Sequence, residues 1–253
     1  MRRNYRLLYP NIYVPCDVEF SARERAQAAW LWSKRRGTVA GLSAAAMLGV
    51  KWIDASEPAE LIHDNRRPPR ALVVWTGNVP ADETLTLNGM RVTTPARTGF
   101  DLGRHISSRT SAVQRLDALA NATDVLRSDI EAMINAHHGA RGIPRLQGVL
   151  PLVDGGAESP QVTVARLALI DAGLPAPKTQ FRVFDAYGQF VARLDMAYDE
   201  VMVGIEYDGP QHWSDPAVRQ RDIDRVSRDL LRYRRATYVA RVDNALRSRG
   251  LRW

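Results

Sequence analysis

Residues 193–212 read RLDMAYDEVMVGIEYDGPQH, and this stretch carries the strongest indication of the fold. Two apolar runs flank a turn at residues 198–200, which predicts a β-hairpin. Side chains alternate between the faces of a strand, so Glu206 and Asp208 lie on one side of the second strand. The hairpin brings Asp195, near the end of the first strand, alongside them. The sequence therefore predicts three carboxylates converging at one edge of a sheet.

Three converging carboxylates repel one another unless a cation or protons neutralise them. Oxygen ligands without cysteine suit hard divalent ions, so Asp195, Glu206 and Asp208 are candidate ligands of Mg²⁺ or Mn²⁺. Such an ion can activate water and stabilise the charge that builds up on a scissile phosphate. Each residue also has a structural alternative, as an exposed strand residue, an ion-pair partner or part of a turn.

The segments around this hairpin alternate between helical and strand patterns. Ser159-Pro160 is a typical helix start, and the helical pattern runs to Ala172. Strands are predicted at 179–184, 189–196 and 201–207, followed by a basic helix over 215–234 and a strand at 237–242. The predicted order is helix, three strands, helix, strand.

These motifs resemble those of the DUF559 family, which is similar to very-short-patch-repair endonucleases and, more distantly, to PD-(D/E)xK nucleases. The resemblance rests on RLD at 193–195, VGIEYDGPQH at 203–212 and RDIDR at 221–225. It implies a restriction-endonuclease-like α-β-β-β-α-β domain over residues 158–253. It also implies Mg²⁺-dependent hydrolysis of DNA, with the catalytic residues Asp195, Glu206, Asp208 and His212. The first three bind the metal, and the histidine transfers a proton or orients water.

Two positions depart from that family's pattern. Its first helix reads Ser-Pro-x-Glu, whereas this chain has Val162 at the acidic position. No lysine follows Lys178, so the lysine of the broader nuclease class is absent. The first departure favours an alternative function, a non-catalytic DNA-binding regulator of the antitoxin type with a degenerate nuclease fold.

The N-terminal half has a different pattern of elements. Ser21-Ala-Arg-Glu24 has the form of a capping box and opens a helix predicted to run to Arg36. A short helix over 43–48 follows, and then four strands at 59–63, 71–75, 84–87 and 91–94, the last two joined by the hairpin turn Asn88-Gly89. Further helices are predicted at 95–102, 109–122, 128–137 and 144–153. The Asp-Gly-Gly-Ala stretch at 154–157 is the predicted domain boundary.

Two motifs in this half resemble the AbiEi-type antitoxin family: SAAAMLG at 43–49 and TPARTGFDL at 94–102. Within the second motif, Arg97 and Asp101 lie one helical turn apart, which predicts an ion pair. The resemblance implies an α+β antitoxin-like region over residues 1–153, in an actinobacterial arrangement with the DUF559-like domain behind it.

In that antitoxin family a winged helix precedes this region, and residues 1–15 resemble only its end. The resemblance implies a toxin–antitoxin role, with DNA and a cognate toxin protein as partners. The chain has 253 residues, a net charge of +7 and a pI near 9.9, which favours a polyanionic partner. Candidate contacts to DNA phosphates, with a solvated surface as the alternative, are Lys34, Arg35, Arg36, Arg66, Arg67, Arg70, Arg221, Arg225 and Arg228.

Several classes of protein are excluded or disfavoured by composition. No apolar run is long enough to span a bilayer, and residues 1–20 lack the pattern of a secretory signal. The single cysteine, Cys16, excludes an internal disulfide and a cysteine-based zinc site. The sequence predicts a cytoplasmic α/β protein without membrane partners.

Overall fold

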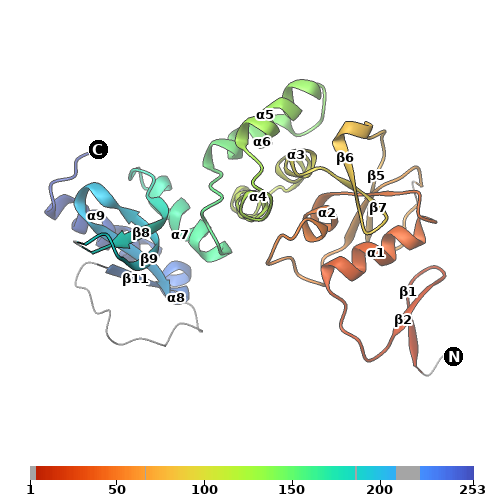
Figure 1. Ribbon diagram of the computed structural model, residues 1–253, viewed down its shortest axis with the longest axis horizontal. Coiled ribbons are helices and arrows are strands. Elements are labelled where there is room, and N and C mark those ends of the chain that lie inside the picture. Colours follow the sequence, from red (N-terminus) through yellow and green to blue (C-terminus); the bar gives the residue numbers. More distant parts are fainter. Residues whose placement is uncertain (1–3, 66, 186, 209–222) are drawn as a thin grey trace. The chain divides into compact units, whose positions relative to one another are not determined.

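The computed structural model describes residues 4–65, 67–185, 187–208 and 223–253, without the side chains of residues 208 and 223–225. The chain divides into two compact units, Met1–Val153 and Asp154–Trp253 (Figure 1). Both units combine helices with a sheet, and the predicted α/β class is confirmed. No helix in the described part of the chain is long and apolar enough to cross a membrane.

The first unit contains a five-stranded mixed sheet. Its strands are β3 (Thr38–Val39), β4 (Ala59–Ile62), β5 (Leu72–Trp75), β6 (Thr84–Leu87) and β7 (Met90–Thr93), in the spatial order β5-β4-β3-β7-β6. Asn88 and Gly89 join the last two strands with φ angles of 50° and 75°. Two residues with positive φ match the twist of an antiparallel pair, so the predicted hairpin is confirmed.

Helix α1 (Ala22–Trp32) and helix α2 (Gly41–Met47) pack against β4, and a hairpin of β1 (Tyr5–Tyr9) and β2 (Ile12–Pro15) lies beside α1. The capping box at Ser21 and Glu24 is present. The prediction that α1 continues to Arg36 was wrong. The helix ends at Trp32 because Lys34 and Arg35 adopt left-handed φ angles of 57° and 63° and turn the chain toward β3.

The rest of the first unit is helical. Helix α3 (Pro95–His105) contacts each of its neighbours, α4 (Arg109–Thr123), α5 (Arg127–Ala136) and α6 (Ile143–Val149). Two glycines of α3 allow this close packing, because a Cβ at Gly99 would stand 2.7 Å from Ile130 and one at Gly103 would stand 2.2 Å from Leu146. The helices α3 to α6 therefore form one layer centred on α3.

The second unit is built around a four-stranded sheet in the order β11-β10-β9-β8. After α7 (Pro160–Asp171) come β8 (Lys178–Phe184), β9 (Phe190–Tyr198), β10 (Val203–Asp208) and β11 (Ile223–Ser227), then α8 (Arg228–Tyr233) and α9 (Arg235–Ser248). One face of the sheet, with Met196 and Ile205 fully buried, joins a core with residues of α7 and α9. The other face carries the candidate site.

Of the predicted helix over 215–234, the described residues 228–233 are helical, as α8, whereas residues 223–227 are not, and the predicted strand at 237–242 was wrong. Residues 223–227 form β11, parallel to β10, and Ser227 caps α8 by accepting a hydrogen bond from the backbone of Leu230. Residues 235–248 form a helix because the buried Tyr238, Val242 and Leu246 recur every four residues. The predicted α-β-β-β-α-β order is thus replaced, in the described residues, by one helix, four strands and two helices.

Candidate functional site

Asp195 and Glu206 lie on neighbouring strands, just beyond the last paired residues. In the antiparallel pair β9–β10, the last paired residues are Met196 and Ile205, and Asp195 and Glu206 follow them directly on their strands. Since Met196 and Ile205 point into the core, alternation along each strand places both carboxylates on the other face of the sheet. Both residues are partly buried. The structure therefore brings together two of the predicted carboxylates. Asp208 ends β10, and its side chain lies outside the described set.

A further polar residue, Gln180, joins this row from β8. The β8–β9 register pairs Thr179 with Met196 and Phe181 with Leu194, so Gln180 falls opposite Asp195. The amide nitrogen and oxygen of Gln180 are buried and have no hydrogen-bond partner among the described residues. The backbone φ of Gln180 is 50°. Sequence reasoning missed Gln180, because the register of β8 against β9 is a tertiary property.

The row extends to the fourth strand, where Arg225 pairs with Glu206 in the parallel ladder β10–β11. We predicted that Arg225 and Arg228 would share a helix, and this was wrong, because Arg225 belongs to β11 and Arg228 begins α8. His212 and Arg221 lie outside the described residues. The described members of the row across the sheet are Gln180, Asp195, Glu206 and the backbone position of Arg225.

The surroundings of the row define how well it suits a metal ion. One carboxylate oxygen of Asp195 accepts a hydrogen bond from the backbone N–H of Tyr207 at 2.8 Å, which fixes this side chain between the strands. Val162 is 2% exposed in the core, and Glu158 forms an exposed ion pair with Arg193 at 3.0 Å. In the described part of the chain, no three His, Cys, Asp or Glu side chains are grouped to hold a metal. The described donors are two carboxylates and one amide oxygen, a partial set for a hard divalent ion.

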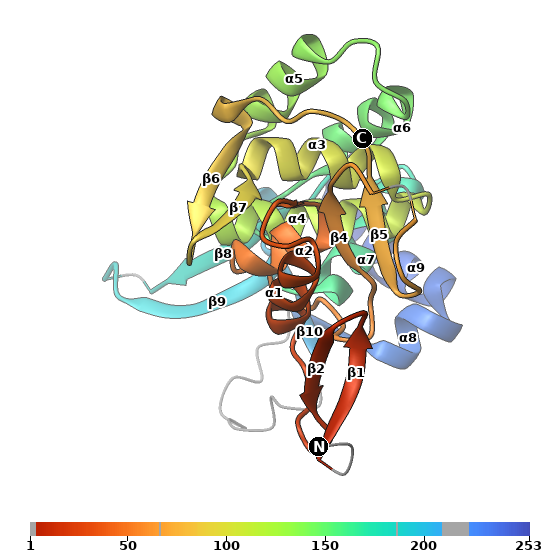
Figure 2. The ribbon, with the colours of Figure 1, turned by 90° about the vertical axis from the view of Figure 1, so that its right-hand side faces the viewer.

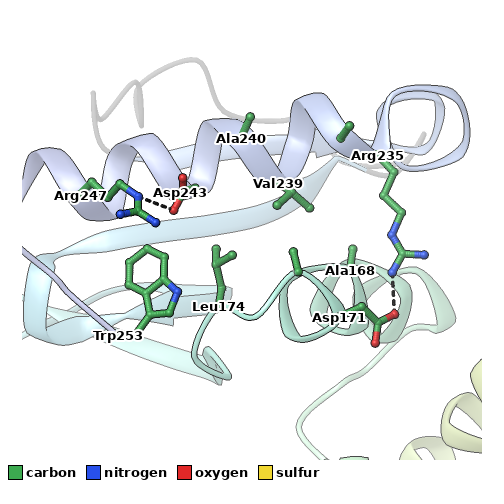
Figure 3. Close-up of a pocket in the computed structure, with 11 residues that line it drawn as sticks. Ala168, Asp171, Leu174, Arg235, Val239, Ala240, Asp243, Arg247 and Trp253 are labelled. Atoms are coloured by element: carbon green, nitrogen blue, oxygen red, sulfur yellow. Dashed lines mark hydrogen bonds and ion pairs between the residues drawn. The ribbon is translucent and has the colours of Figure 1, made fainter.

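The same unit also has an open groove of about 740 Å³ between α7 and α9 (Figure 3). Its exposed floor includes Ala172, Ala236 and Ala240. An ion pair between Arg235 and Asp171, with a 2.9 Å separation, lies at one end, and Arg247 bonded to Asp243 lies near the other, beside Trp253. None of the lining residues belongs to the carboxylate row.

In the first unit, the predicted DNA contacts fall on two separate segments. Lys34, Arg35 and Arg36 form an exposed turn before β3 (the basic turn), and the Arg35 guanidinium lies 5.7 Å from the centre of the Trp30 ring. Thr38 pairs with Ile62, so the basic turn lies near the end of β4. Arg67 and Arg70 are exposed in the loop that leads back to β5, whereas Arg66 is outside the described residues. Leu72 pairs with Ala59, which places Arg70 near the start of β4, away from the basic turn.

The first unit also contains a buried charge network around Arg97. The predicted pair of Arg97 with Asp101 is confirmed at 3.0 Å, and Arg97 also contacts Glu83 at 2.5 Å. His137 reaches the other oxygen of Glu83 at 2.5 Å, and Arg104 contacts Asp101 at 2.7 Å. Spacing within the motif predicted only the first contact. Of the others, Arg97 with Glu83 joins α3 to the segment before β6, His137 with Glu83 joins that segment to the end of α5, and Arg104 with Asp101 lies within α3.

Beside this network, Trp75 links two partly buried titratable groups. Its ring stacks on His105, with centres 3.8 Å apart and planes inclined by 11°, and its indole N–H donates to Glu60 at 2.9 Å. Burial raises the pKa of Glu60, although the hydrogen bonds from Trp75 and Leu42 act in the opposite direction. Burial, reinforced by Arg104, lowers the pKa of His105 to about 4. The structure therefore holds a neutral histidine at this position near pH 7.

Comparison with known proteins finds one family model, which matches within the first unit. Residues 34–152 match the family model described as the AbiEi antitoxin C-terminal domain. Two uncharacterized proteins of Mycobacterium tuberculosis, from strains CDC 1551 and H37Rv, are each 34% identical to this chain over 136 residues. The match covers 54% of this chain and 49% of each relative, so the chain spans about half the length of these curated relatives. No solved structure gives a significant match.

These comparisons support one of the two predicted family resemblances and not the other. The antitoxin resemblance of the first unit is supported by a family match over residues 34–152. No DUF559 or endonuclease family matches the second unit, so the predicted endonuclease is not supported. The comparisons favour the alternative that we derived from the sequence, an antitoxin-type protein, over hydrolysis of DNA.

Proposed function

We propose that this protein is a non-catalytic, antitoxin-type regulator that binds a cognate toxin protein and DNA. The observation that carries the proposal is the match of residues 34–152 to the AbiEi antitoxin C-terminal domain. This segment includes the five-stranded sheet and the helical layer around α3. Its fold rests on the buried network of Arg97, Asp101 and Glu83, which gives the motif at 94–102 a structural role.

The toxin-binding part predicts neutralisation in cells. We expect co-expression of the full chain with the toxin encoded beside its gene to restore growth and to allow the two proteins to be purified together. Asp195→Asn should restore growth equally well, because neutralisation by binding needs no chemistry at the carboxylate row. Failure of the parent chain to restore growth, or loss of rescue in Asp195→Asn, would contradict the proposal.

The DNA-binding part predicts a salt-dependent interaction through the basic turn. Lys34, Arg35 and Arg36 are exposed, and each phosphate contact that is lost lowers the salt slope of binding by about 1. Changing all three residues to Gln should lower the slope by about 3 in fluorescence anisotropy with duplex DNA and EDTA. The charge-matched control replaces the exposed Arg109, Arg127 and Arg141 by Gln. An equal decrease of the salt slope in both triple variants would show that only net charge matters. It would contradict a contact between the basic turn and DNA.

A second candidate function, Mg²⁺-dependent hydrolysis of DNA, is favoured by one observation, the placement of Asp195 and Glu206 on the same face of neighbouring strands. These carboxylates and the amide oxygen of Gln180 are the described groups that would hold Mg²⁺ or Mn²⁺. The ion would supply activated water and charge stabilisation. The same purified chain distinguishes the two functions. For a non-catalytic regulator, plasmid DNA stays supercoiled with Mg²⁺. Nicking that disappears in Asp195→Asn would replace our proposal with this second one.

A further inference from the structure

The outer half of the β8–β9 hairpin extends beyond the rest of its sheet (Figure 2). Strand β10 pairs with β9 only at residues 196–198, whereas β8 and β9 stay paired as far as Phe184 and Phe190. Residues 182–185 and 187–193 therefore make up a two-stranded projection, which we call the arm. A two-stranded ribbon without further support is only marginally stable in water. The hairpin conformation of the arm therefore depends on its turn.

The turn at the end of the arm is fixed by one carboxylate. Asp185 Oδ1 accepts hydrogen bonds from the backbone N–H groups of Tyr187 and Gln189, each at 2.8 Å. The backbone N–H of Asp185 donates to the carbonyl of Gln189 at 2.9 Å. The turn holds large side chains in solvent, because Phe184 is 50% exposed, Tyr187 89% and Phe190 55%. A defined scaffold thus presents exposed aromatic rings.

Two arginines lie between these rings and the carboxylate row. Arg182 is opposite Arg193 in the β8–β9 register, so both share one face, and Asp195 lies on that face two residues further along β9. The Arg182 guanidinium is 5.3 Å from the ring centres of both Phe184 and Phe190. One face of the hairpin therefore presents, from the sheet outward, a carboxylate, two guanidinium groups and two aromatic rings.

We propose that this face of the arm binds single-stranded nucleic acid. Aromatic rings stack on unpaired bases of any sequence, and guanidinium groups neutralise the adjacent phosphates. Base faces are covered in a duplex, so exposed rings on a projecting ribbon favour a single strand. The pair of Arg193 with Glu158 is exposed on both sides, at 51% and 43%, and such pairs contribute little, so Arg193 can exchange its partner for a phosphate.

The side chains of the arm are better suited to binding a nucleic acid than to binding in the apolar groove of a partner protein. Each phenylalanine ring already contacts the guanidinium of Arg182, so charge and aromatic surface are interleaved. The Asp185 carboxylate oxygen is engaged by two backbone N–H groups of the turn. The proposal concerns a different unit from the basic turn, and it requires neither the toxin nor hydrolysis.

The test measures binding of the full chain to labelled oligo(dT) and oligo(U) of about 20 nucleotides, a length that exceeds the site size of one stacking domain. Anisotropy is recorded with EDTA. The double variant Phe184→Ala with Phe190→Ala should weaken binding about 10-fold to 100-fold. The matched control is Tyr233→Ala, because this ring is 70% exposed and also lies 5.3 Å from a guanidinium, that of Arg232. The control should stay within about 2-fold of the parent chain, since no base stacks on it.

A comparison of oligo(dT) with oligo(U) tells which sugar the arm prefers. The proposal is overturned if the parent chain binds neither oligonucleotide, if the double variant binds like the parent, or if Tyr233→Ala loses as much affinity. Loss of toxin binding in the double variant without any oligonucleotide binding would make the arm a protein contact instead. Duplex binding through the basic turn together with binding of neither oligonucleotide would overturn this proposal alone.

Discussion

Replacing Arg97 by methionine should lower the free energy of unfolding of the first unit by about 3–5 kcal/mol. The guanidinium contacts Glu83 at 2.5 Å and Asp101 at 3.0 Å, and the three residues are exposed by only 8%, 6% and 3%. Methionine leaves two carboxylates buried without their shared cation. Removing one partner of a buried ion pair costs more than the pair contributes, because the remaining charge has lost its compensation.

Urea unfolding followed by circular dichroism measures this change. Arg127→Met is the matched control, because Arg127 pairs with Glu131 at 3.4 Å with more than half of each side chain exposed. We expect the control to shift the unfolding free energy by less than about 0.5 kcal/mol. If both variants lost a similar amount of unfolding free energy, burial of the Arg97 network would not explain its contribution to stability.

The same network predicts a loss of stability in acid. Burial opposes ionisation of Glu83, but the hydrogen bonds and charges of Arg97 and His137 outweigh it and keep its pKa below the ordinary value of 4.5. A lowered carboxyl pKa contributes stability above the pKa of the unfolded chain, and that contribution disappears as the pH falls through the folded pKa. The contribution of Glu83 should therefore be complete near pH 6 and decline below about pH 4.5.

The second large effect is expected at His105, whose protonation is opposed by the fold. Burial and the charge of Arg104 lower its pKa from 6.5 to about 4. Below pH 6.5 the unfolded chain takes up a proton that the folded chain does not, so stability falls as the pH drops toward 4. The loss over this range is on the order of 3 kcal/mol. Glu60 acts in the opposite direction, because a raised carboxyl pKa contributes stability that is lost as the pH rises.

His105→Phe isolates this contribution, because phenylalanine keeps a ring against Trp75 and cannot be protonated. We expect its unfolding free energy to fall less between pH 7 and pH 4.5 than that of the parent chain. The exposed His138 supplies the control, and His138→Gln should keep the pH dependence of the parent. An unchanged pH dependence in His105→Phe would show that another group causes the acid sensitivity.

Much of the fold was predictable because its signals are local. The capping residue Ser21, the Asn88-Gly89 turn and the Ser159-Pro160 start act within a few residues of the chain, and each lies where the sequence predicted it. The ion pair of Arg97 with Asp101 followed from helical spacing. These features needed no knowledge of distant segments, since capping and turn chemistry are short-range.

The errors concentrate where burial overrides local preference. Thr237 to Val242 is rich in residues typical of strands, yet Tyr238, Val242 and Leu246 are fully buried on one side of α9. The β propensity of such residues reflects how well they fit a half-buried surface, so a helix that buries them satisfies the same preference. Arg225 moved from a predicted helix to β11 because that segment completes the sheet beside β10.

The hairpin at residues 193–212 shows which features of the site can be predicted from the sequence alone. Alternation along each strand determined that Asp195 and Glu206 face the side opposite the core residues Met196 and Ile205. Only the tertiary structure decided that Gln180 joins them, that Arg225 pairs with Glu206, and that the outer hairpin projects as an arm. The physical reason is register: the sequence sets which face a side chain occupies, whereas packing between distant segments sets which residues stand side by side.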